Sequence, residues 1–192
     1  MSDIICLIVG MSGSGKSTVV KRLCDKYKLK DVQSYTTRPK RYPKEQGHIF
    51  VTDEEFNTLE NICAYTEIKG YKYGATTEQV DESDLYIIDE EGIEYFDKHY
   101  KGDKKIKIVR MYIDESTCIL RMKKRGDSIE DIHFRMMFDR RRKSKFNNVI
   151  SNAKNIKRDD VLYVDAGNLT PDKTADYIYY NVFKSGNTNY GD

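Results

Sequence analysis

An apolar run at residues 4–9 leads directly into the glycine-rich stretch GMSGSGKS at residues 10–17. This stretch fits the pattern GxxxxGK[ST], in which glycines allow backbone N–H groups to turn inward around phosphate oxygens. The apolar run shows no alternation and therefore predicts a buried strand. After the loop, apolar residues recur at helical spacing and predict a helix that begins near Lys16 or Ser17. Strand, loop and helix thus occur in the order that a phosphate-binding loop requires.

The rest of the chain predicts an α/β fold with a parallel sheet flanked by helices. Apolar runs at residues 85–88 and 106–113 read as further central strands, and each is followed by a helical segment. The run at residues 161–165 predicts an added strand before the last helix. Between residues 31 and 74, short runs rich in Tyr, Thr and Ile alternate with glycine, which predicts small antiparallel strands inserted in the main fold.

Composition restricts the class of protein. The 192 residues are 39% hydrophobic, and no apolar stretch approaches the roughly 20 residues that span a bilayer, so a cytoplasmic protein without membrane association is expected. The four cysteines form no CxxC pair and the three histidines no HxxH pattern, which disfavours disulfides and structural zinc. A net charge of +2 disfavours nucleic acid as a partner. Basic clusters at residues 38–44 and 121–145 instead predict local anion sites. A monomer and a homodimer are both compatible with this composition.

The glycine loop predicts ATP and Mg²⁺ as ligands. Lys16 can reach the β- and γ-phosphates, and the Ser17 hydroxyl can ligate Mg²⁺. Kinases, GTPases and motor-type ATPases share this loop; a DxxG match at residues 89–92 fits a GTPase, but no NKxD follows, which disfavours that class. The remaining residues predicted to contact ATP through the loop are Gly10, Ser12, Gly13, Ser14 and Gly15.

A second basic motif suggests where the phosphoryl group goes. Residues 34–41 read SYTTRPKR and residues 47–51 read GHIFV. Here the chain resembles the guanylate kinase family, which carries Ser-x-Thr-Thr-Arg, a further Arg, then Gly and Tyr-x-Phe-Val. The resemblance continues, in the family's order, through further motifs up to residue 152. These are Glu67 with Gly70 and Tyr73-Gly74, the strand end Ile88-Asp89, RGDS at 125–128 with Arg135, and FNNVISN at 146–152.

The resemblance implies a P-loop kinase fold with a small inserted domain that binds a nucleoside monophosphate and with a helical lid. It implies ATP-dependent phosphorylation, most simply of GMP or dGMP, with small-molecule nucleotides as partners. The expected core comprises residues 1–30, 76–120 and 143–184. The expected insertion is 31–75 and the expected lid is 121–142, and residues 185–192 are expected to form a disordered tail.

The resemblance also implies roles for residues in the insertion. Arg38 and Arg41 offer forked donors to the acceptor phosphate, and Tyr73 adds a hydroxyl to it. His48 falls where the family has a phosphate-binding Tyr and could donate to the same phosphate. Ser34 and Glu67 would sit against the guanine, whose N1–H and N2–H₂ groups suit a carboxylate.

Other implied roles belong to the core and lid. Asp89 would orient the base or the waters of Mg²⁺. Arg125 and Arg135 would close over ATP and, with Lys16 and Arg38, make up the catalytic set. Competing lid candidates are Arg121, Arg140, Arg141 and Arg142. The adenine edge of ATP is expected to meet Asn152 or Asn168.

Departures from the family pattern leave alternatives open. Ala75 stands where the family has a small hydroxyl residue, and the loops after Arg41 and Asp89 are shorter. The acceptor could therefore be another nucleoside monophosphate or a small phosphorylated metabolite. A non-catalytic guanylate-kinase-like binding module is a further alternative. Such modules tend to lose the glycine loop, whereas Lys16 and Ser17 are intact here.

Overall fold

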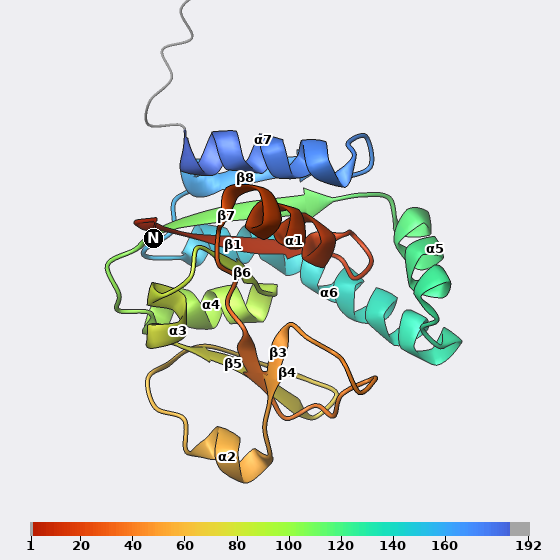
Figure 1. Cartoon of the computed structure of the whole chain (residues 1–192), viewed down its shortest axis with the longest axis horizontal. Coiled ribbons are helices and arrows are strands. Elements are labelled where there is room, and N and C mark those ends of the chain that lie inside the picture. Colours follow the sequence, from red (N-terminus) through yellow and green to blue (C-terminus); the bar gives the residue numbers. More distant parts are fainter. Residues whose placement is uncertain (1, 185–192) are drawn as a thin grey trace, which may run out of the picture.

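A computed structural model describes residues 2–184 and contains two sheets (Figure 1). The tail predicted for residues 185–192 lies outside the described residues. The main sheet is parallel throughout, and its strands run in the order β6 (Leu85–Ile87), β1 (Ile4–Gly10), β7 (Lys105–Tyr112) and β8 (Val161–Asp165). The sequence-based prediction of a parallel α/β fold is confirmed, including the added strand before the last helix.

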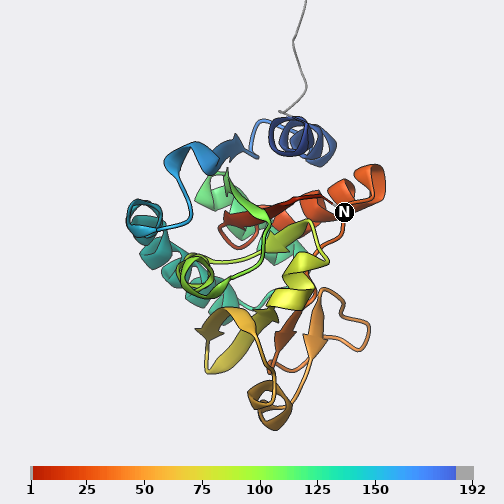
Figure 2. The same ribbon diagram turned by 90° about the vertical axis from the view of Figure 1, so that its left-hand side faces the viewer.

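Strand β1 is buried on both faces, as its unbroken apolar run predicts. Ile5 and Leu7 pack on the side of α4 (Glu90–His99) and α6 (Ile129–Asn152). Cys6 and Ile8 pack on the opposite side, against α1 (Lys16–Tyr27) and α7 (Pro171–Phe183). All four side chains are fully buried. Figure 2 shows the sheet held between these two helical layers. The carboxyl end of β1, where the glycine loop begins, is therefore a rigid base for a site.

The second sheet lies below α4 in Figure 1. Its strands run in the order β3 (His48–Phe50), β2 (Ser34–Thr36), β5 (Tyr71–Thr76) and β4 (Ile62–Ile68). The pairs β2–β5 and β4–β5 are antiparallel as predicted, but β2 and β3 are parallel. The difference arises because residues 37–47 carry the chain back to the start of β2 before β3 begins. That return loop holds the basic motif.

Short helices complete the fold. A Thr52 capping box starts α2 (Asp53–Asn57), and a second box at Thr76 starts α3 (Thr77–Asp81), which leads into β6. After β7, α5 (Glu115–Arg125) ends at Gly126, and a 3₁₀ turn, η1 (Arg158–Asp160), precedes β8. Within residues 2–184, no helix has the length and apolar character needed to cross a bilayer.

Helix α6 connects the parts of the molecule. Near its start, Met136 packs with Met122 of α5. Near its end, Phe146 and Ile150 pack into the core beneath the main sheet. One continuous helix of 24 residues therefore runs through the boundary predicted between lid and core at residue 142. The division into core, insertion and lid stays a prediction.

Candidate active site

The glycine loop at residues 10–17, here called the phosphate loop, wraps around the ammonium of its own lysine. Lys16 Nζ donates to the carbonyl oxygens of Gly10 at 2.5 Å and Met11 at 2.9 Å. Gly13 has a φ of +80°, and a Cβ there would lie 2.6 Å from the Cys118 carbonyl oxygen, so the close approach to α5 requires glycine. Burial lowers the pKa of Lys16, against the attraction of Asp139. The amino group of Lys16 is thus held by neutral carbonyl groups of the loop itself.

The phosphate loop fits a polyphosphate ligand. Ser14 Oγ is buried and has no hydrogen-bond partner within residues 2–184, so the loop contains a polar atom that its own fold leaves unsatisfied. Ser12 N–H donates to Asp139 Oδ2 of α6 at 2.7 Å, which fixes the outer part of the loop. Ser17 is exposed at the start of α1, where its hydroxyl is accessible to a hydrated cation.

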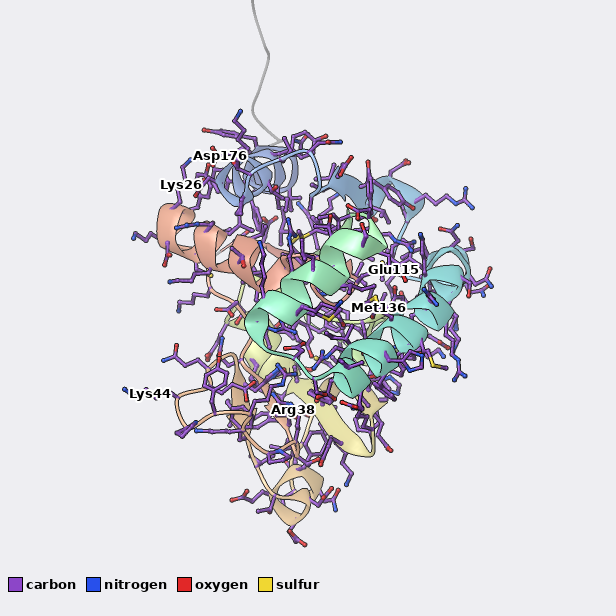
Figure 3. The ribbon with its side chains drawn as sticks, turned by 90° about the vertical axis from the view of Figure 1, so that its right-hand side faces the viewer. Lys26, Arg38, Lys44, Glu115, Met136 and Asp176 are labelled. Atoms are coloured by element: carbon purple, nitrogen blue, oxygen red, sulfur yellow. The ribbon has the colours of Figure 1, made fainter. Side chains whose placement is uncertain are left out.

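Ser34, Arg38, Arg41, His48 and Tyr73 lie together and form a candidate for the second anion site. Strand pairing brings it together, because Ser34 lies opposite His48 on β2 and β3, and Tyr73 lies opposite Thr36 on β5. Ser34 Oγ and His48 Nδ1 share a hydrogen bond of 2.9 Å. Figure 3 shows Arg38, which lies in the return loop just after β2, beneath the turn that joins α5 to α6.

The charges of this second site indicate that it suits an anion. Burial lowers the pKa of Arg41, and the nearby cations Arg38 and Arg135 lower it further. Burial also lowers the pKa of His48, with Arg38 adding to the effect, so its imidazole is neutral at neutral pH. The Nε atoms of Arg38 and Arg135 are buried without a hydrogen-bond partner among the described residues. A bound anion would relieve both the repulsion and the missing hydrogen bonds.

Both sites open into one cavity of about 620 Å³, here called the central cavity. It is also lined by aromatic residues of the second sheet and of α6. The site residues predicted from the sequence that line it are Gly10, Ser12, Lys16, Ser34, Arg38, Arg41, His48, Tyr73, Asp89 and Arg135. The fold therefore brings together residues from five separate parts of the sequence.

Glu67 is not among the residues that line the central cavity. From β4 the cavity is lined by Tyr65, Thr66 and Ile68, and from β5 by Tyr71 and Tyr73, with Tyr73 opposite Thr66. Because side chains alternate along a strand, Glu67 lies on the other face, where it is exposed and pairs in register with Lys72. The prediction that Glu67 faces the acceptor base is corrected by this geometry.

Asn152 is also remote from the phosphate loop. Asp139 of α6 contacts that loop, and Asn152 lies about 20 Å farther along the helix axis. It lines a separate cavity with Glu94 and Asp97 of α4. Of the two asparagines considered for the adenine edge, Asn168 is the nearer, since a small cavity of about 190 Å³ is lined by Ser14 and Gly15 of the loop and by residues on both sides of Asn168.

The lid arginines separate into distinct environments. Arg125 is paired with Asp127 through two hydrogen bonds and does not itself line the central cavity, whereas Arg135 does. Arg121 donates to the Ser14 carbonyl oxygen at 3.1 Å, and Arg140 is an exposed partner of Glu115. These contacts distinguish side chains that the sequence presents only as a run of positive charge.

Arg142 is buried, although in the sequence it stands within a run of positive charge. Its guanidinium lies 3.7 Å from the Phe138 ring centroid and donates to Asp89 Oδ2 at 2.6 Å and to Thr66 Oγ1 at 3.2 Å. The signal was present in the sequence, because Arg142 lies four residues before Phe146, on the buried stripe of α6. Glu45, in the loop between β2 and β3, is also buried. No repeating apolar pattern indicates its burial, because that loop is irregular.

Comparisons with known proteins come from sequence and from structure. No family model matches the chain. It is 30% identical over 140 residues to guanylate kinase from Mycoplasmoides gallisepticum, covering 67% of this chain and 72% of that protein. It is 29% identical over 132 residues to guanylate kinase from Bartonella quintana, covering 63% of this chain and 59% of that relative's length.

Two solved structures share the fold. A crystal structure of guanylate kinase from Anaplasma phagocytophilum aligns with a TM-score of 0.53 at 16% identity, covering 97% of this chain and 87% of that one. An uncharacterized protein from Eubacterium ventriosum aligns with a TM-score of 0.51 at 15% identity, covering 95% and 99%. At these identities the structural matches show the fold alone.

Proposed function

The chain belongs to the guanylate kinase family, and we propose that it is an ATP- and Mg²⁺-dependent kinase that phosphorylates a nucleoside monophosphate, with GMP or dGMP as the preferred acceptor. One observation carries the proposal: a single cavity is lined by Lys16 at the phosphate loop and by Arg38 at the second anion site. Phosphoryl transfer between two nucleotides needs two anion sites that meet, and little covalent chemistry from the protein.

The protein's own groups position and neutralise the two phosphates. ATP binds with its phosphates in the phosphate loop, where the orphaned Ser14 hydroxyl and the Lys16 ammonium donate to them. The exposed Ser17 hydroxyl would help to hold the Mg²⁺ that accompanies ATP, and that ion would supply charge neutralisation and orientation. The acceptor phosphate lies between Arg38 and Arg41. Its second pKa is near 6, so it is dianionic at neutral pH and needs no general base from the protein.

The lid and the base site complete the proposal. The segment 121–142 closes over both nucleotides, and Arg135, which lines the central cavity, neutralises charge on the migrating phosphoryl group. With Glu67 on the other face of the sheet, three carboxylates line the cavity: Asp89, Asp131 and Asp139. Asp131 pairs with Lys69 and Asp139 accepts from the Ser12 N–H, so Asp89 is assigned to guanine N1–H and N2–H₂. Ser34, in the same cavity, can donate to guanine O6.

The test is ADP formation from ATP with GMP, dGMP, AMP, CMP and dTMP supplied one at a time. We expect kcat/KM for GMP or dGMP to exceed that for AMP by roughly tenfold or more. The N1 atom of adenine is an acceptor, so it repels the Asp89 carboxylate instead of donating a hydrogen bond to it. Chromatography should show the matching nucleoside diphosphate. A better rate with another monophosphate overturns the guanine assignment alone. ADP formation that no monophosphate stimulates means transfer to water and overturns the kinase assignment, while no ADP formation with any monophosphate overturns it in favour of the binding module.

Removal of the Arg41 side chain should separate the two anion sites. We expect Arg41→Ala to raise the acceptor's KM roughly tenfold or more, since charged hydrogen bonds to the acceptor phosphate are lost. Calorimetric titration should give an unchanged Kd for ATP. The matched control is Arg22→Ala, an exposed arginine of α1 that pairs with Asp172. Equal weakening of ATP and acceptor by Arg41→Ala contradicts a dedicated acceptor site.

A further inference from the structure

Glu45 is a buried carboxylate inside an exposed loop. It belongs to the return loop at residues 37–47, where its neighbours Lys44 and Gln46 are exposed, yet its side chain is only 6% exposed. In Figure 3 Lys44 lies at the outer edge of the loop, away from Arg38. A carboxylate is costly to bury unless it is paired, so its partners indicate why it is there.

Both oxygens of Glu45 are bound by the second anion site. Oε1 accepts from Arg38 Nη2 at 2.8 Å, and Oε2 accepts from Arg38 Nη1 at 3.2 Å and from the Arg41 backbone N–H at 2.6 Å. Burial acts to raise the pKa of Glu45, but the hydrogen bonds from Arg38 and from the Arg41 N–H together hold it below its ordinary value. Glu45 is therefore ionised at neutral pH, and it fixes the Arg38 guanidinium relative to the backbone of Arg41.

This pairing leaves a defined face of Arg38 free. A guanidinium can bind an oxyanion end-on, through Nη1 and Nη2, or side-on, through Nε and Nη2. Glu45 takes the end-on face, and Nη1 also donates to the Pro39 carbonyl oxygen at 2.7 Å. Nε is buried without a hydrogen-bond partner among residues 2–184, and the Arg38 side chain is only 10% exposed while lining the central cavity.

We propose that Glu45 is a positioning residue: by occupying the end-on face of Arg38, it directs the Nε side of that guanidinium at the acceptor phosphate. Tyr73 lies beside Arg38 and lines the same cavity. The phosphate then meets a pre-aligned fork instead of a mobile side chain, which lowers the cost of binding. This inference rests on the proposed function, because it names how the acceptor site of that kinase is built. The opposite arrangement, in which Glu45 occupies the phosphate's own place, predicts the opposite sign for the test below.

The first measurement is steady-state kinetics of Glu45→Gln with each monophosphate that the native enzyme accepts. Glutamine keeps the size but puts an amide NH₂ against a donor, so the Arg38 fork loses its fixed position. We expect the acceptor's KM to rise roughly tenfold with little change in the KM for ATP. The matched control is Glu54→Gln, an exposed glutamate of α2. An unchanged or lowered acceptor KM in Glu45→Gln overturns the proposal, and a lowered one shows that the carboxylate competes with phosphate.

A double-mutant cycle with Arg38→Lys separates positioning from general loss of structure. If Glu45 acts through Arg38, Glu45→Gln adds little to the acceptor KM once the fork is gone. Additive effects, with each substitution raising KM by the same factor in either background, overturn the proposal. Thermal melts of all variants show which of them are folded, and the cycle compares folded variants only.

A second readout is independent of kinase activity. The Arg38 Nε–H resonance, assigned by its loss in Arg38→Lys, is followed while inorganic phosphate is added to the full chain. We expect phosphate to shift this resonance in the native protein and to need roughly tenfold more concentration in Glu45→Gln. No response of the resonance overturns the inference. A normal response in a protein that phosphorylates no monophosphate supports the inference while the proposed function fails.

Discussion

Replacement of Lys16 by alanine is expected to lower kcat by about a hundredfold to a thousandfold, as does loss of a single preorganised donor in other transition states. The ammonium lies inside the phosphate loop, on the Gly10 and Met11 carbonyl oxygens, and it lines the central cavity that the Arg38 side chain also lines. It can therefore follow negative charge on the phosphoryl group as this leaves ATP. The measurement is single-turnover formation of the nucleoside diphosphate at saturating ATP and acceptor.

The control for Lys16→Ala is Lys21→Ala on the same helix, where an exposed lysine pairs with Asp25. We expect this control to keep native turnover, because exposed pairs four residues apart on a helix contribute little. ATP affinity of Lys16→Ala, determined by calorimetry, shows how much of the loss is ground-state binding. If the variant retains near-native turnover, the phosphate loop is not the donor site.

Local patterns explain why the phosphate loop could be predicted from the sequence. An apolar run, a glycine loop and a helical repeat all lie within residues 4–27, and each signal depends only on its near neighbours. The strand β1 and the helix α1 begin and end close to where those signals place them. The basic motif at residues 34–41 is also contiguous in the sequence and could be recognised there. The structure brings its Arg38 and Arg41 to the same cavity as Lys16.

The misplaced residues depend on contacts that lie far apart in the sequence. Whether Glu67 faces the cavity is decided by its pairing with β5, and the register of that pair shifts between Ile62 and Ala64. A shift of one residue exchanges the two faces of a strand, and a motif cannot show it. Asn152 was selected by its place in a motif, but α6 continues without a break and carries it away from the phosphate loop. The burial of Glu45 likewise appears only when the return loop folds over Arg38.

The second large effect is on stability, where Arg142→Ala is expected to lower the free energy of unfolding by about 3 kcal/mol, near the lower end of the range for broken buried pairs. The Arg142 side chain is 7% exposed and donates to Asp89, which is 17% exposed, and it forms a further ion pair with the less buried Glu91. The substitution by alanine removes the guanidinium that pairs with Asp89 and Glu91, and it leaves empty space beside the Phe138 ring. In the variant, Asp89 Oδ1 still accepts the hydrogen bond from the Gly92 N–H at 2.7 Å, which limits the loss of stability.

Urea denaturation followed by circular dichroism measures this effect, and Arg140→Ala is the matched control. Arg140 is on the same helix but 64% exposed, so loss of its pair with Glu115 should cost under about 1 kcal/mol. Arg142 differs because it binds β4 through Thr66 and the start of α4 through Asp89, which ties the second sheet, the main core and α6 together. Loss of that tie should lower the midpoint of a single transition. Equal stability of the two variants would show that the Arg142 pairs contribute no more than surface pairs. A separate early transition in Arg142→Ala alone would instead show that Arg142 couples the second sheet to the rest of the molecule.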